Sequence, residues 1–141
     1  MESLVAGAFP RGALLVIDSA PIIYTLAGHP RLAARYSELF ERHSVGELIF
    51  AVTTMTLAEV LTGPLAAGEE ALAKRYRALL ESWRMIEMNA DIAESAARIR
   101  ARFKLKLPDA IQVASALAIN AAALVTHDRD FASVRGLTVV G

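Results

Sequence analysis

The chain has 141 residues, 55% hydrophobic and 21% charged, a balance that indicates a folded domain with a buried core and excludes a disordered chain. Its 15 basic and 15 acidic residues cancel, so any surface that binds nucleic acid must be local rather than a general positive charge. The absence of cysteine excludes disulfides, thiol catalysis and cysteine-bound zinc.

Short apolar runs alternate with helical patterns along the chain. The runs predict strands that are buried on both faces of a sheet, at residues 14–17, 48–52, 85–88, 123–126 and 137–140. The helices predicted between them cover residues 21–27, 30–45, 56–61, 69–83, 89–103 and 108–118, and either Asn89 or Asp91 caps the fifth of these. This alternation predicts an α/β fold with a mostly parallel sheet of four to five strands covered by helices on both faces. We expect one domain over residues 1–141, with its core in residues 14–140.

Four acids are placed where a parallel sheet would gather them. Asp18 directly follows the first strand, Glu59 lies in the helix after the second, and Asp128 follows the fourth. Asp109 comes after Pro108 in the first turn of a helix whose other residues are nearly all apolar, so this acid must lie where the core opens to solvent. The carboxyl ends of parallel strands share one edge of the sheet, and ligands bind at that edge.

Carboxylates that converge in this way need a positive charge between them. At ~5 Å and an effective dielectric constant of about 20, each pair repels by roughly 3 kcal/mol. Such a cluster is stable only if some acids hold protons or a cation lies among them. A site made of oxygen ligands alone selects a hard divalent ion, and the sequence therefore predicts Mg²⁺ or Mn²⁺ at this edge.

Each of these acids also suits a local structural role. Asp18 can cap the helix that follows it, Glu59 stands three residues after Thr56 as in a capping box, and Asp109 favours the positive end of a helix dipole. Asp128 and Asp130 are common turn residues. Caps have no reason to recur at one edge, so the convergence itself favours the metal site.

Four segments of the chain resemble a known family. Residues 16–30, which contain Asp18, are similar to the opening of a PIN domain, and residues 56–65 around Glu59 resemble the segment with its second acid. Residues 107–110 around Asp109 and residues 126–131 around Asp128 are similar to its third and closing acidic motifs. The resemblance extends over residues 14–140, and the size and order of motifs are similar to those of VapC-type toxins.

The resemblance implies a fold and a set of site residues. The fold is a PIN-like, Rossmann-like three-layer αβα sandwich. The catalytic and metal-binding acids would be Asp18, Glu59, Asp109 and Asp128, and the auxiliary residues would be Ser19, Thr126 and Asp130. In one departure, Ala20 occupies a position where the family often has a polar residue.

The function that the resemblance implies is that of a metal-dependent endoribonuclease, the toxin of a type II toxin–antitoxin pair. Water activated by Mg²⁺ or Mn²⁺ would hydrolyse RNA phosphodiesters to leave 5′-phosphate and 3′-hydroxyl ends. The basic residues near the third acid and in the closing turn would contact RNA, although each also suits a solvated surface: Arg98, Arg102, Lys104, Lys106 and Arg129.

The resemblance also implies partners. A cognate antitoxin and a second copy of the chain would bind near the helices after the first strand, at Ile23, Leu26, Leu39 and Phe40, although core packing suits most of these residues better. We expect a cytoplasmic location without membrane contact, because no basic cluster precedes the first apolar residues.

Two other function classes fit the sequence less well. An aspartyl phosphatase needs a second acid two residues after the first, where this chain has Ala20. A catalytically inactive PIN-like module that only binds a partner protein would have no reason to retain mutually repelling acids.

Overall fold

The computed structural model describes residues 1–141 and contains one sheet of five parallel strands in the order β3-β2-β1-β4-β5. The strands are β1 (Ala13–Ile17), β2 (Leu48–Thr53), β3 (Arg84–Ile86), β4 (Ala123–Val125) and β5 (Val139–Val140). The predicted α/β fold is confirmed, and the sheet is parallel throughout. The chain moves outward from β1 to β3 and then returns to place β4 beside β1. The order therefore switches between β1 and β4, where open sheets of this kind bind ligands.

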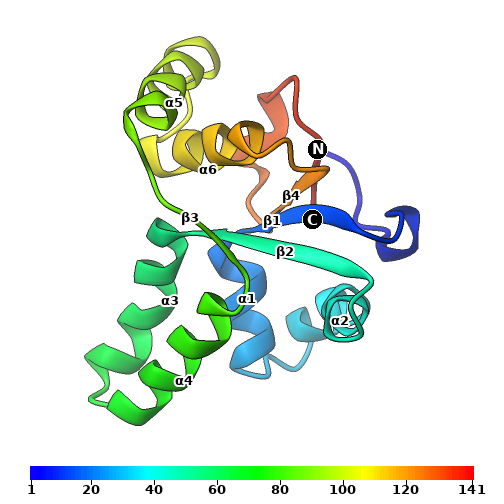
Figure 1. Cartoon of the computed structure of the whole chain (residues 1–141), viewed down its shortest axis with the longest axis vertical. Coiled ribbons are helices and arrows are strands. Elements are labelled where there is room, and N and C mark those ends of the chain that lie inside the picture. The colour runs from blue at the N-terminus through cyan, green and yellow to red at the C-terminus, as the bar shows by residue number, and fades with distance from the viewer.

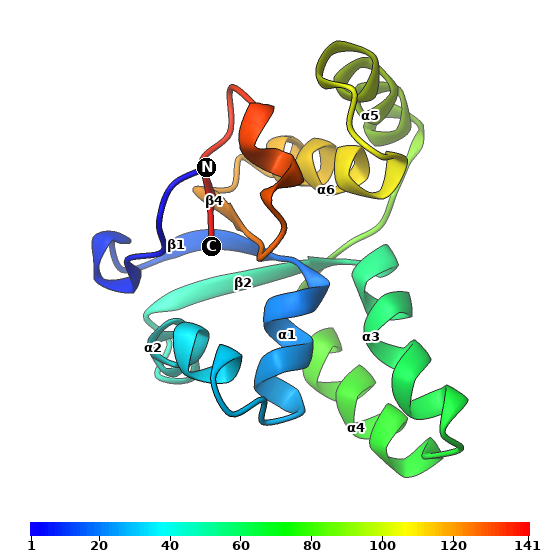
Figure 2. The same cartoon turned by 180° about the vertical axis from the view of Figure 1, so that it is seen from behind.

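Helices cover both faces of the sheet (Figures 1 and 2). One face carries α1 (Ser19–Leu26), α2 (Leu32–Ser44), α3 (Thr54–Ala66) and α4 (Glu70–Glu81). The other carries α5 (Ala90–Phe103), α6 (Leu107–Ala118) and the short 3₁₀ helix η2 (Arg129–Ser133), and a second 3₁₀ helix, η1 (Ala6–Ala8), precedes the sheet. None of the helices is both long and apolar enough to cross a membrane.

The alternation of side chains along β1 divides the core in two. Leu15 and Ile17 are fully buried among α1–α4, while Val16 between them is buried among α5 and α6. This is the pattern of a strand whose successive side chains point to opposite faces. Both faces of the strand are apolar because helices cover both, which is why the run shows no polar alternation.

Helix α3 differs from its predicted bounds at both ends. It begins at Thr54 rather than Thr56, because the Thr53 hydroxyl accepts a hydrogen bond from the Thr56 N–H at 3.1 Å and so caps the helix. It also continues beyond Gly63 and Pro64 to Ala66, since the Gly63 and Pro64 carbonyls still accept bonds from the following turn. The predicted capping box of Thr56 and Glu59 is therefore wrong.

Other bounds differ by smaller amounts. Helix α1 begins at Ser19, directly after Asp18, and Asn89 rather than Asp91 caps α5 by accepting the Ile92 N–H at 2.9 Å. Three predicted strands are shorter than expected. Strand β3 ends at Ile86, β4 ends at Val125, and β5 begins only at Val139.

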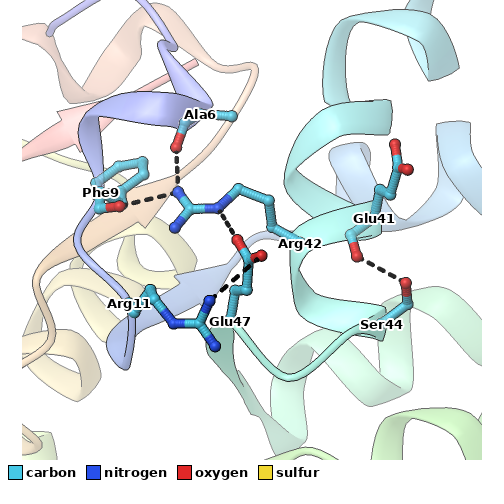
Figure 3. Close-up of polar contacts among 7 residues, drawn as sticks. All are labelled: Ala6, Phe9, Arg11, Glu41, Arg42, Ser44 and Glu47. Atoms are coloured by element: carbon cyan, nitrogen blue, oxygen red, sulfur yellow. Dashed lines mark hydrogen bonds and ion pairs between the residues drawn. The ribbon is translucent and has the colours of Figure 1, made fainter.

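The segment before β1 is held to the rest of the fold by Arg42 near the end of α2 (Figure 3). Its guanidinium donates to the carbonyls of Ala6 and Phe9 at 2.6 and 2.9 Å and to the Glu47 carboxylate at 2.8 Å. The exposed Arg11 lies 3.7 Å from the same carboxylate. Arg42 thus joins η1 to the turn between α2 and β2, at the end of the sheet opposite the acids.

Candidate active site

The fold brings the N-terminal ends of α1, α3 and α6 to the edge where β1, β2 and β4 end (Figures 1 and 2). Asp18 is the residue between β1 and α1, and Asp109 lies in the first turn of α6. Glu59 lies in the second turn of α3, and Asp128 follows β4 and caps η2. Asp18 and Asp109 are 91 positions apart in the chain (109 − 18), and their negative charges act on each other across this edge.

Three carboxylates at this edge are close enough to share a cation. Asp109, Asp128 and Asp130 each place an oxygen within 4.8 Å of the other two. The Asp128 carboxylate accepts the Asp130 N–H at 2.9 Å, and the Thr126 hydroxyl accepts the Asp128 N–H at 3.0 Å. These bonds within the turn fix the positions of both acids. Asp130, expected only as an auxiliary acid, belongs to this group.

Asp18 is oriented by three hydrogen-bond donors from three parts of the chain. One carboxylate oxygen accepts the Ser19 N–H at 2.9 Å and the Gln112 side-chain amide at 2.8 Å. The other accepts the Thr126 hydroxyl at 2.7 Å. Ser19 thus contributes its backbone, whereas Thr126 contributes its side chain and links Asp18 to Asp128. With both oxygens engaged, the carboxylate has one orientation.

Gln112 is a site residue that the sequence interpretation missed. It is 1% exposed and donates to Asp18 and to the Thr56 hydroxyl, each at 2.8 Å, while its oxygen accepts the Thr53 hydroxyl at 2.9 Å. A carboxylate can only accept, so the nitrogen of the amide must face Asp18. A glutamine within an otherwise apolar helix, opposite two threonines that follow a strand, was the available signal.

The negative charges of the site repel one another. Burial, followed by the negative charges of Asp128, Asp18 and Asp130, raises the pKa of Asp109 to about 6. Partial desolvation, with the charges of Asp18 and Asp109, also raises the pKa of Glu59. The charge of Asp18 thus acts on both Glu59 and Asp109, although Asp18 and Glu59 do not belong to the group of three carboxylates within 4.8 Å of one another.

Asp109 also carries a buried oxygen, Oδ2, without a hydrogen-bond partner. A buried carboxylate oxygen left unpaired is costly, and it indicates a group that is meant to bind something else. The donor set around it consists only of carboxylate oxygens, which hard divalent cations such as Mg²⁺ and Mn²⁺ prefer. The residues present therefore fit a divalent ion.

The basic residues expected to contact RNA are spread over several surfaces. Lys106 lies beside the acids, with its ammonium 3.7 Å from Asp130. Arg98 and Arg102 line a separate hollow of about 380 Å³ with Arg135 and Phe103. Lys104 ends α5 in a left-handed conformation, and Arg129 lines a cavity beside the chain ends with Arg35.

The residues expected to bind partners lie on α1 and α2. Leu39 is fully buried and Leu26 and Phe40 pack against the core, while Ile23 is exposed. His127 is half-buried beside these helices, because Tyr36 shares a hydrogen bond of 3.1 Å with its ring and Tyr24 packs edge-on against it.

Comparison with known proteins agrees with this arrangement. Residues 15–137 match the family model described as PIN domain. Among curated proteins, none matches the chain in sequence.

Solved structures share the fold over most of the chain. A toxin–antitoxin complex from Klebsiella pneumoniae is 27% identical with a TM-score of 0.72, over 90% of this chain and 96% of that one. VapBC2 from Rickettsia felis, bound to a DNA fragment from its promoter, is 19% identical with a TM-score of 0.71, over 89% and 96%. VapC20 from Mycobacterium tuberculosis, a sarcin–ricin loop cleaving toxin, is 18% identical with a TM-score of 0.66, over 84% and 93%. Because the family model matches residues 15–137 of the 141 in this chain, and the fold is shared with these proteins, this chain belongs to the PIN domain family.

Proposed function

We propose that this chain is a metal-dependent endoribonuclease that acts as the toxin of a toxin–antitoxin pair. The observation that carries the proposal is the Asp109 carboxylate, which has an unpaired buried oxygen, a pKa raised to about 6 and two further acids within 4.8 Å. Such an arrangement stabilises a bound divalent ion and destabilises the empty protein. Membership of the PIN domain family and its toxin neighbours support a nuclease.

The residues of the site take separate roles in this proposal. Asp109, Asp128 and Asp130 would hold the ion, and Asp18, whose carboxylate accepts from Gln112 and Thr126, would be a further ligand, as expected from the sequence. When bound, Mg²⁺ or Mn²⁺ supplies an activated water and stabilises the charge that develops on the phosphate. Glu59, whose pKa is raised, suits proton transfer at this edge. Attack by water does not need the 2′-hydroxyl of RNA, so the products would carry 5′-phosphate and 3′-hydroxyl ends.

Two kinds of partner follow from the same proposal. The neighbour from Klebsiella pneumoniae is a toxin–antitoxin complex, which supports a cognate antitoxin for this chain. The exposed apolar Ile23 on α1 offers a contact for such a protein or for a second copy in a homodimer. With cellular RNA as its substrate, the protein would act in the cytoplasm.

The proposal is tested by RNA cleavage with the wild type, Asp18→Asn and Asp109→Asn, in Mg²⁺, Mn²⁺ and EDTA. We expect cleavage in either metal, none in EDTA, and a loss of at least about 100-fold in both variants, because removal of a charge-stabilising group costs about this much. Asp91→Asn, an exposed acid in the first turn of α5, is the matched control and should cleave as the wild type does. Cleavage that persists in EDTA would disprove the metal mechanism. A protein that binds an antitoxin but cleaves no RNA would instead be an inactive PIN-like module.

A further inference from the structure

A cavity of about 260 Å³ lies at the same edge of the sheet as the acids, beyond the ends of β2 and β3. Seven residues from β2, α3, β3 and α6 and the chain just after β3 line it: Thr53, Thr54, Met55, Ile86, Met88, Ile111 and Ser115. The only polar side chains in its wall are the hydroxyls of Thr53, Thr54 and Ser115, and none is charged. We call it the edge pocket.

Gln112 forms the partition between the edge pocket and the acids. Its oxygen accepts from the Thr53 hydroxyl in the pocket wall at 2.9 Å, and its nitrogen donates to Asp18 at 2.8 Å. On α6, at 3.6 residues per turn, Gln112 is about 60° around the helix from Asp109 on one side and about 60° from Ser115 on the other. The pocket is therefore one side chain away from the site where the proposed function places the scissile phosphate.

The chemistry of the edge pocket differs from that of the acid cluster. Its walls are apolar at Met55, Ile86, Met88 and Ile111, so a phosphate would find no positive charge there. Ser115 is 1% exposed, and it lines the wall of the pocket together with the apolar side chains. A hydroxyl at the wall of an otherwise apolar cavity suits a flat ligand that carries hydrogen-bonding groups on its rim.

We propose that the edge pocket binds a nucleobase, that of a nucleotide directly flanking the scissile phosphate. This inference rests on the proposed ribonuclease function and adds to it a pocket that selects the RNA sequence to be cleaved. Met55 and Met88 contact the face of the base, since flexible thioethers adapt to aromatic surfaces. Ser115 bonds to its edge, so bases that differ at that edge are cleaved at different rates. RNA would thus be fixed by two adjacent sites, one for phosphate at the acids and one for a base.

The test uses short RNA oligomers with a single cleavage site, intact or with an abasic ribose at either flanking position. For the wild type, loss of the correct base should lower kcat/KM by about ten-fold, which is the scale of one stacked base. Met88→Ala and Ser115→Ala should lower kcat/KM on intact RNA by a similar factor and leave the rate on abasic RNA unchanged. Leu65→Ala, another exposed apolar side chain on the far end of α3, is the control and should behave as the wild type.

Binding of the same oligomers in EDTA, measured by fluorescence anisotropy, separates this inference from the proposed function. A base-dependent affinity that Met88→Ala and Ser115→Ala abolish supports the edge pocket even if no cleavage is found. Equal effects of the abasic substitution in wild type and variants would overturn the inference while the ribonuclease stands. A drop in molar mass on sedimentation caused by Met88→Asp would also overturn it, because a second copy of the chain would then cover the pocket. If Met88→Ala fails to fold by circular dichroism, the conservative Ser115→Ala decides.

Discussion

The raised pKa of Asp109 affects the stability of the folded protein as well as the chemistry of the site. A carboxyl whose pKa rises from 3.8 to about 6 on folding binds its proton more tightly in the folded protein than in the unfolded one. The metal-free protein should therefore lose stability as the pH rises from about 4 to 6, by on the order of 1–2 kcal/mol in total, because solvent screens the charge of this partly exposed carboxyl. Below pH 4 the group is protonated in both states and costs nothing.

Asp109→Asn should consequently stabilise the metal-free protein at pH 8 and have little effect at pH 4. The amide keeps the shape of the side chain and removes the charge that Asp128, Asp18 and Asp130 repel. Urea unfolding in EDTA at the two pH values measures the difference, with Asp91→Asn as the exposed control. An Asp109→Asn variant that unfolds at lower urea than the wild type at pH 8 would contradict the assigned cause.

Substitution of Gln112 tests whether the orientation of Asp18 depends on a buried hydrogen-bond network. Gln112→Leu retains the volume but removes one hydrogen bond each from Thr53, Thr56 and Asp18. We expect a loss of about 2 kcal/mol in unfolding free energy, the scale of a few buried hydrogen bonds, and weaker Mn²⁺ binding by calorimetry. Thr126→Val, which removes the donor to the other oxygen, should weaken Mn²⁺ binding in the same direction. Unchanged Mn²⁺ affinity in both variants would show that Asp18 needs neither donor.

At the scale of the element, the sequence predicts what depends on local pattern. All five strands were recognisable as apolar runs, because helices cover both faces of the sheet and leave no polar alternation. The predicted end of helix α5 at Phe103 is confirmed, since its caps and its apolar periodicity indicate the same bounds. Helix α3 was predicted too short at both ends, because Gly63 and Pro64 resemble a stop although their carbonyls still accept hydrogen bonds in the last turn.

Helix α5 gives a prediction that leaves the acids untouched. Asn89 accepts the Ile92 N–H at 2.9 Å and is the only side chain that caps this helix. Asn89→Ala should lower the unfolding free energy by about 1 kcal/mol, whereas Asn89→Asp should retain the cap. Urea unfolding measures both, and metal binding should be the same in the two variants. A similar loss for Asn89→Asp would mean that packing, and not the cap, stabilises the start of α5.

For the whole molecule, the sequence predicts that acids gather at one edge of the sheet, and it misses the side chains that orient them. The acids follow strands or begin helices, and a parallel sheet brings such positions to one edge. The bonds of Gln112 to Thr56 and Asp18 span 56 and 94 positions and depend on how α6 packs beside α3 and β1. No local pattern encodes that packing. For the same reason the sequence indicated Asp130 only as an auxiliary acid, although the 3₁₀ turn brings it within 4.8 Å of Asp109.

A divalent ion should raise the stability of the whole chain, and Asp109→Asn, which removes one of its proposed ligands, should abolish most of that gain. An ion that binds only the folded protein adds about 2.7 kcal/mol at 100 times its Kd, which for a chain of this size raises Tm by roughly 8 °C. The wild type should therefore melt higher in Mn²⁺ than in EDTA, and Asp91→Asn should do the same. Asp109→Asn, expected to be more stable than the wild type in EDTA, should gain little from Mn²⁺ and become the less stable of the two. Differential scanning calorimetry at pH 8 measures this reversal. An equal gain in Tm for both proteins would place the ion elsewhere than on Asp109.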